Sequence, residues 1–388
     1  MTLHKINPEP TSAETRPLSV SLSFQHDLYD LGEVVFKARA LQAFENAACR
    51  YAIHRLARCA VRRSVQATFD DLALNSGFAA QRLDRGTLLL EGTGLFVHAD
   101  GRQKAGYCSC TFNIWADNKE HAQVARDTLL QTVGERIPPE EMFVIDWQFS
   151  SARGGLSSAS FEEVFHEVLH DEAYPTLGEP VRQFVQRYLD ARETVLVLQG
   201  SPGTGKTRLV RSVLGAMSRR KGISAEIMYT ADKRALENDE IFVEFITGDH
   251  DAFVIEDADH MLMARTNGNQ DLHRFLAIAD GVVRAQGRKI IFTTNLPNIG
   301  DLDDALLRPG RCFQVVRTRL LNSDEVERLI ARVCPDDPRQ RQRELARSNC
   351  IPAGTRSVSV AEVYRACEQA SAELSHLAGP KSHLIAAG

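Results

Sequence analysis

The chain lacks the features that mark a membrane-spanning or secreted protein. No run of about 18 apolar residues occurs anywhere in the sequence, which excludes a typical membrane-spanning helix. The N-terminal stretch MTLHKINPEPTSAETRP is polar and has no apolar core, unlike a secretory signal. The 8 cysteines include no CxxC pair, so they are expected to be reduced, mostly buried thiols. We therefore expect a soluble, cytoplasmic protein without a membrane partner.

A strong charge of one sign is also missing. The 46 Lys and Arg residues against 51 Asp and Glu residues leave a net charge of −5, which argues against a basic nucleic-acid coat. The 25 glycines and 14 prolines are close to average usage, which argues against long disordered or collagen-like stretches. At about 150 residues per domain, 388 residues predict two or three domains.

The N-terminal part predicts a small α+β domain over residues 26–150, after a flexible tail at 1–25. Helix-forming composition runs from Asp30 to Val65, and a second helix is expected at Asn118–Arg136. Strands are expected at four runs bounded by turn residues: Thr87–Glu91, Leu95–Ala99, Tyr107–Trp115 and Met142–Phe149. The Gly/Ser-rich residues 151–160 predict a linker.

The first predicted helix is basic. Its cations are Lys37, Arg39, Arg50, Arg55, Arg58, Arg62 and Arg63. They could form a nucleic-acid face, but no aromatic stacking pattern accompanies them, which favours a solvated helix face.

Two patterns resemble metal sites. His166, Glu167 and His170 match HExxH, which on a helix can hold zinc beside a general base. No third ligand follows nearby, so we favour an amphipathic helix whose apolar stripe, from Phe161 to Leu169, packs on the next domain. Cys108 and Cys110 have strand spacing and face one side, where buried thiols are favoured over a metal site.

A phosphate-binding loop is the strongest pattern. The apolar run Thr194–Gln199 predicts a buried parallel strand and leads into a match to GxxxxGK[ST], followed by a helix opening at Arg208. The loop consists of Gly200, Ser201, Pro202, Gly203, Thr204, Gly205, Lys206 and Thr207. Its backbone N–H groups can surround a phosphate, Lys206 can reach the β- and γ-phosphates, and the Thr207 hydroxyl can bind Mg²⁺. ATP and Mg²⁺ are the expected cofactors, with Arg208 part of the nucleotide site.

Polar groups follow two further strands predicted at Ala252–Ile255 and Lys289–Thr294. Glu256 and Asp257 end the first, and Asn295 ends the second. In a doubly wound sheet these ends lie beside the phosphate loop, where one carboxylate can hold Mg²⁺ and its neighbour can polarise water. Farther on, Arg308 and Arg311 have the spacing for phosphate contact.

In these motifs the chain resembles the AAA+ ATPases, over roughly Tyr174 to Ala372. GSPGTGKT resembles Walker A, VIEDAD Walker B and FTTN the sensor-1 strand, and LDDALLRPGR is similar to the region that carries arginine fingers. IEDAD and FLAIADGVV are similar to the mitochondrial Rieske-protein translocase group of the AAA clade. The resemblance implies a doubly wound parallel-sheet P-loop ATPase core at 161–319 and a small helical lid at 320–378, followed by a tail.

The same resemblance implies residue roles. Glu256 would hold Mg²⁺ and Asp257 would activate water, while Arg308 and Arg311 would act on ATP bound by a neighbouring subunit in a ring of six or seven. Arg356 stands where many AAA+ lids carry a sensor-2 arginine. Thr230–Leu236 lacks the aromatic–apolar–glycine triplet of peptide-threading members, which favours remodelling of a folded partner.

Three functions fit these patterns. The first is a ring-forming ATPase that remodels or moves a protein partner engaged by the N-terminal domain. The second is a nucleic-acid-linked ATPase of a defence or mobile-element system, using the basic segment. The third is a scaffold whose assembly is gated by nucleotide.

Overall fold

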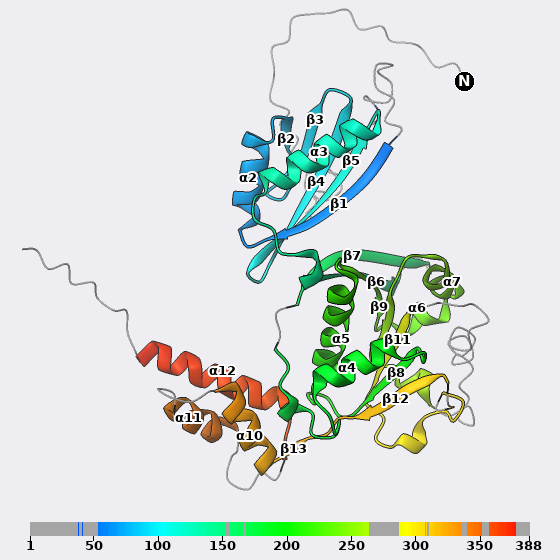
Figure 1. Ribbon diagram of the computed structural model, residues 1–388, viewed down its shortest axis with the longest axis vertical. Coiled ribbons are helices and arrows are strands. Elements are labelled where there is room, and N and C mark those ends of the chain that lie inside the picture. Colours follow the sequence, from blue (N-terminus) through cyan, green and yellow to red (C-terminus); the bar gives the residue numbers. More distant parts are fainter. Residues whose placement is uncertain are drawn as a thin grey trace, which may run out of the picture. The chain divides into compact units, whose positions relative to one another are not determined.

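The computed structural model describes residues 53–151, 155–165, 168–263, 287–306, 308, 310–334, 340–350 and 357–377, with the helical positions 38 and 41. The chain divides into two compact units, Met1–Arg136 and Ile137–Gly388 (Figure 1). The predicted domain boundary at residue 150 therefore lies C-terminal to the observed one, which falls between Arg136 and Ile137. No helix in the described ranges is both long and apolar enough to cross a bilayer.

The first unit is built on a five-stranded antiparallel sheet in the order β1-β5-β4-β3-β2. Two helices pack on one face of this sheet and share one apolar core with it (Figure 1). The elements are β1 (Ile53–Val61), α2 (Val65–Asn75), β2 (Ala79–Arg82), β3 (Thr87–Gly92), β4 (Leu95–Lys104), β5 (Tyr107–Ala116) and α3 (Lys119–Thr132). The three strands predicted between Thr87 and Trp115 are confirmed, as is the second helix, which Asn118 caps.

The helix predicted from Asp30 to Val65 is wrong over Ile53–Val61, which forms β1. Each residue of β1 pairs with one of β5, so sheet pairing outweighs the helix-forming composition of IHRLARCAV. The basic segment is therefore not one helical face. Arg55 donates to the Gln123 side chain at 2.8 Å and Arg63 pairs with Asp71 at 2.6 Å, while Lys37, Arg39 and Arg50 lie outside the described residues.

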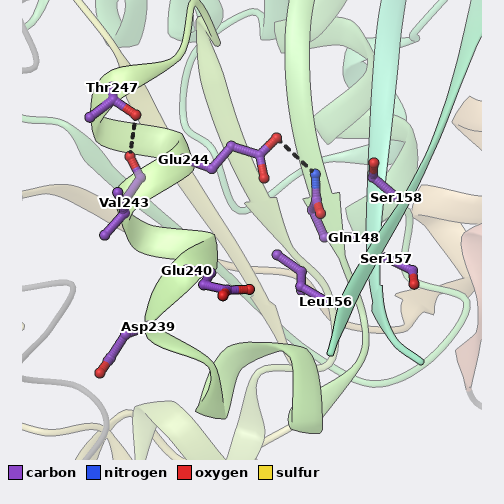
Figure 2. A pocket seen from close by; sticks show the side chains of 9 residues that line it. All are labelled: Gln148, Leu156, Ser157, Ser158, Asp239, Glu240, Val243, Glu244 and Thr247. Atoms are coloured by element: carbon purple, nitrogen blue, oxygen red, sulfur yellow. Dashed lines mark hydrogen bonds between the residues drawn. The ribbon is translucent and has the colours of Figure 1, made fainter. Parts of the chain in front are cut away.

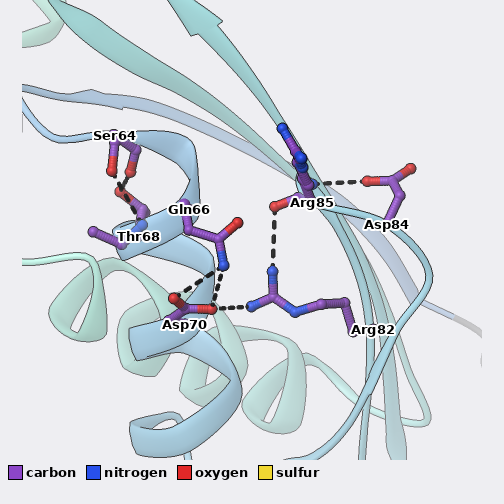
Figure 3. A network of polar contacts seen from close by, with 9 residues as sticks. Ser64, Gln66, Thr68, Asp70, Arg82, Asp84 and Arg85 are labelled. Atoms are coloured by element: carbon purple, nitrogen blue, oxygen red, sulfur yellow. Dashed lines mark hydrogen bonds and ion pairs between the residues drawn. The ribbon is translucent and has the colours of Figure 1, made fainter.

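A polar network ties the edge strand β2 to α2 (Figure 3). Arg82 donates to Asp70 at 2.6 Å and Gln66 donates to the same carboxylate at 3.0 and 3.1 Å. Ser64 caps α2 by accepting from the Ala67 N–H at 3.2 Å. These bonds hold the most exposed strand of the sheet in place.

The second unit is built on a seven-stranded sheet in the order β12-β8-β11-β10-β9-β6-β7. All neighbours pair in parallel except β6 and β7, as expected for a doubly wound α/β core. The strands are β6 (Met142–Ser150), β7 (Leu156–Val164), β8 (Val195–Gln199), β9 (Ala225–Thr230), β10 (Ala252–Ile255), β11 (Lys289–Thr294) and β12 (Cys312–Arg317). Strands β10 and β11 have the predicted bounds.

Helices cover both faces of this sheet. Alternate residues of β8 belong to two different cores, with Leu196 and Leu198 in one and Val195 and Val197 in the other. The first core includes α4 (Val181–Asp190) and α5 (Lys206–Lys221), and the second includes α6 (Lys233–Glu237), α7 (Asp239–Thr247) and α8 (Asp259–Leu262).

Strands β6 and β7 extend the sheet beyond β9. The linker predicted at residues 151–160 and the helix predicted from Phe161 are wrong where described, because Leu156–Val164 pairs with β6 along its whole length. The strand at Met142–Phe149 is confirmed, but it belongs to this sheet rather than to the N-terminal domain. The local sequence SSASFEEV has too few apolar residues to indicate an edge strand.

Three described helices and a two-stranded antiparallel sheet complete the unit. They are β13 (Leu321–Asn322), α10 (Ser323–Val333), α11 (Gln340–Cys350), β14 (Ser357–Val358) and α12 (Val360–Leu377). Asn322 and Glu325 form a capping box at α10, and Ser359 and Glu362 exchange the equivalent bonds at α12. We call α10, α11 and α12, with this small sheet, the lid.

Candidate functional site

The loop between β8 and α5 has the backbone that a phosphate-binding turn requires. Gly205 has φ +93°, which strains any residue with a Cβ, and a Cβ there would lie 2.9 Å from the Tyr174 hydroxyl. At Gly200 a Cβ would meet the Thr318 carbonyl at 2.2 Å. The glycines thus let the loop pass close to two other segments before α5 begins at Lys206.

Lys206 lies inside the curve of the loop and is 8% exposed. Its Nζ donates to the Gly200 carbonyl at 2.5 Å, to the Ser201 carbonyl at 3.1 Å and to Asn295 Oδ1 at 2.9 Å. Burial lowers the pKa of Lys206 from its ordinary value, and nearby carboxylates, Asp257 first, oppose the shift. Lys206, at the start of α5, and Asn295, after β11, are therefore brought together, although the sequence predicted each of them separately.

Glu256 lies beside the first turn of α5. Its Oε1 accepts from the Thr207 hydroxyl at 2.7 Å and its Oε2 accepts from the Tyr229 hydroxyl at 2.8 Å. Burial and the Glu256 carboxylate raise the pKa of Tyr229, so the phenol remains a hydrogen-bond donor. A hydroxyl and a carboxylate oxygen side by side are ligands of the kind that Mg²⁺ prefers, so these residues fit that ion.

Asp257 adopts a left-handed backbone, with φ +50°, at the end of β10. Its N–H donates to the Thr293 hydroxyl at 3.1 Å, and its Oδ1 accepts from Asn295 Nδ2 at 2.9 Å. Non-glycine residues in this conformation are strained and concentrate at functional sites. The two neighbouring strand ends together aim the carboxylate toward Asn295 and the loop.

Asp259 fixes the end of β11. Its Oδ1 accepts from the Thr294 hydroxyl at 2.5 Å and from the Asn295 N–H at 2.7 Å. Sequence reasoning assigned no role to Asp259 or to Tyr229. Asp259 stands within VIEDAD, and Tyr229 lies near the carboxyl end of β9, the strand next to β10, so strand order is the signal that could have found them.

The two candidate finger arginines differ in environment. Arg308 is exposed, whereas Arg311 is half-buried and donates from Nη1 to the Ala305 carbonyl at 2.8 Å. Arg311 therefore braces its own loop. Arg356 lies outside the described residues, as do Phe275–Val283, which carry FLAIADGVV.

The lid touches the loop directly. The Ala361 N–H, in the first turn of α12, donates to the Gly203 carbonyl at 2.9 Å. Arg208 places its guanidinium 3.8 Å from the centre of the Tyr364 ring, which connects α5 to α12. Arg208 thus lies next to the loop, between the sheet core and the lid.

Comparison with known proteins agrees with this geometry. Residues 196–320 match the sequence model of the ATPase family associated with various cellular activities (AAA). The match covers the loop, the acidic strand end, Asn295 and both arginines. The second unit contains an AAA+ ATPase domain.

A similar protein is the ATP-dependent zinc metalloprotease YME1 homolog of Caenorhabditis elegans, 28% identical over 196 residues. The similarity covers 46% of this chain and 24% of the length of that relative. The chain therefore spans about a quarter of the length of that protein. The protease activity in the name of that relative is not assigned to this chain.

The HExxH match at residues 166–170 does not change the assignment of an AAA+ domain. His166 and Glu167 lie outside the described residues, and the segment before them is β7 rather than the helix that the motif needs. In the described ranges no group of three or more His, Cys, Asp or Glu side chains is arranged to hold a metal ion.

Cys108 and Cys110 do share one buried face, with sulfurs 3.7 Å apart. Hydrogen bonds with Cys108 and Cys59, and burial, raise the pKa of Cys110. A raised pKa keeps this thiol protonated and unreactive.

Proposed function

We propose that the chain is a ring-forming AAA+ ATPase that hydrolyses ATP to remodel or move a protein partner. The observation that carries the proposal is the connected set Lys206, Asn295 and Asp257, in which an amide bridges the loop lysine to a carboxylate through bonds of 2.9 Å each. Phosphoryl transfer depends mostly on positioning and charge neutralisation, which such a set can supply.

Each residue has a distinct task in this proposal. Lys206 and the loop N–H groups bind the phosphates, and Thr207 and Glu256 hold Mg²⁺, which neutralises phosphate charge when bound. Asp257 accepts a hydrogen bond from the attacking water and orients it, while Asn295 holds Asp257 in place. Arg208, stacked on Tyr364, keeps the lid against the nucleotide loop.

Arg308 is the proposed finger that acts on a neighbouring subunit, because its side chain is exposed while Arg311 is bound to its own loop. An arginine finger contributes about 10³–10⁵ in turnover rate. Arg308→Ala is therefore expected to lower turnover at least about 100-fold while each subunit still binds ATP.

Mixed assemblies test the trans arrangement. Lys206→Ala subunits lack nucleotide binding but keep Arg308, and Arg308→Ala subunits have the opposite defect. Mixing them is expected to raise ATP turnover well above that of either variant alone. Turnover that never exceeds the separate values would contradict the shared site, and Glu368→Gln, an exposed change on α12, is the control.

The protein partner is tested by trapping. Asp257→Asn should bind ATP without hydrolysing it, so tagged variant expressed in the native host should retain its client. A nuclease-resistant protein supports remodelling. Salt-sensitive DNA or RNA would favour the nucleic-acid alternative, which the paired Arg55 and Arg63 do not favour. An empty assembly would favour the scaffold.

A further inference from the structure

A groove of about 550 Å³ opens beside α7 (Figure 2), and none of its lining residues belongs to the nucleotide loop. The lining residues of the groove come from β6, from α7 and from the start of β7, at Leu156. Apolar residues of α7, such as Ile241 and Phe245, pack with β9 and β10, and the face of β6 and β7 extends beyond them. The opposite side of α7 therefore borders the groove, where Val243 is 57% exposed.

The groove is acidic. Its lining includes Asp239, Glu240 and Glu244 and no Lys, Arg or His. Glu240 and Glu244 lie four residues apart and so share one side of α7, and neither has an ion-pair partner in the described chain. Like charges so placed repel each other, and a bound cation would relieve that repulsion.

A buried acceptor in the same groove lacks a partner. Gln148 is 1% exposed, and its Nε2 donates to Glu244 Oε1 at a long 3.4 Å. Its Oε1 accepts no hydrogen bond from the described residues. Figure 2 shows the Gln148 amide and the Glu244 carboxylate pointing toward each other across the groove. Buried carbonyl oxygens are almost always hydrogen-bonded, so this one indicates a ligand donor.

Strand β7 offers the backbone of a binding site next to these groups. Strand β7 is the last in the order of the described strands, so one of its edges pairs with no other described strand. Ser158 of β7 lies opposite Gln148 in the ladder. An extended peptide that paired with β7 here would direct alternate side chains over the face that carries Gln148.

We propose that this groove binds an arginine side chain of an extended, basic segment in a partner polypeptide. A guanidinium has five N–H donors in one plane, enough for a bidentate bond to Glu244 and a further bond to Gln148 Oε1. A lysine ammonium is a compact point charge and matches this planar arrangement less well. The site requires neither ATP turnover nor a ring, so it stands apart from the proposed ATPase function.

The test uses the full chain and a fluorescein-labelled peptide, Gly-Val-Arg-Val-Arg-Val-Gly, followed by anisotropy. The matched probe carries citrulline at both arginine positions, which keeps the shape and removes the charge. The arginine peptide is expected to bind, and Glu244→Gln is expected to weaken its binding at least about tenfold. Gln148→Leu should weaken it as well, and Glu368→Gln, which removes one charge elsewhere, should not.

Equal binding of the citrulline peptide, or undiminished binding to Glu244→Gln, would overturn the proposal. So would a change in oligomeric mass in Glu244→Gln without peptide binding, which would assign the groove to contact between copies. ATP turnover and thermal unfolding of Glu244→Gln should match the unmodified chain, which separates this test from that of the ATPase. Glu240→Gln provides a second variant if Glu244→Gln unfolds.

Discussion

Glu256 shows how a single side chain is positioned from two directions. Thr207 comes from the first turn of α5 and Tyr229 from the end of β9, and each donates to a different oxygen of the carboxylate. Only one of these donors belongs to the phosphate-loop motif. In the proposed function, Tyr229 is therefore a positioning residue that would act on bound Mg²⁺ through Glu256.

Tyr229→Phe removes one hydrogen bond and leaves the ring in place. A hydrogen bond to a charged group is worth about 1.5–3 kcal/mol, so a freed carboxylate should bind Mg²⁺ in a poorer orientation. The Mg²⁺ concentration that gives half-maximal ATP turnover is expected to rise about tenfold. A merely structural role would lower stability and leave the Mg²⁺ dependence unchanged, and Tyr107→Phe in the first unit is the matched control.

At the scale of elements, the lid depends on the start of α10. Arg319 donates to both oxygens of Glu325 at 2.7 Å, and the Asn322 N–H donates to the same carboxylate at 2.9 Å. Arg319 holds the pKa of Glu325 below its ordinary value. A lowered folded pKa stabilises the protein above the unfolded pKa of about 4.3, and this contribution is lost as pH falls through the folded value.

Arg319→Gln is thus expected to lower the unfolding temperature at pH 7 by about 2–4 °C, for a loss near 1 kcal/mol. The difference from the unmodified chain should shrink as pH falls from about 4.3 through the lowered pKa of Glu325, below which this carboxyl is protonated in both. Thermal unfolding, followed by circular dichroism across this pH range, measures the difference in unfolding temperature between the two proteins. Arg332→Gln, an exposed change on the same helix, should show no such pH dependence.

At the scale of the whole molecule, β6 and β7 decide where one unit ends and the other begins. Phe143 and Val144 of β6 are fully or almost fully buried, and β6 joins the end strand β7 to β9 in the second unit's sheet. Removing β6 would expose the edge of β9 and an apolar surface.

A fragment of residues 137–388 is therefore expected to unfold cooperatively on heating. A fragment of residues 151–388, which begins at the boundary predicted from composition, is expected to aggregate or to melt without cooperativity. Circular dichroism and sedimentation compare the two. Equal cooperative unfolding of both fragments would show that β6 is dispensable.

Much of the core could be predicted because its signals are local. Continuous apolar runs such as AFVI and KIIFTT identify buried parallel strands, and glycines at required positions identify the loop. Strand β7 has no such run, since its edge position tolerates SSASFEEV, and β1 has a composition that suits a helix. Both depend on partner strands far away in the sequence.

The sequence by itself determined the phosphate loop, the acidic end of β10, Asn295 and the capped helices of the lid, because each requires particular residues at fixed spacing along the chain. Tertiary structure alone decided that Tyr229 holds Glu256, that Arg311 is bound while Arg308 is exposed, and that β6 and β7 widen the sheet beside an acidic groove. Those features arise where segments that are distant in sequence pack together. The contacts between such segments depend on the folded arrangement, so no local spacing of residues predicts them.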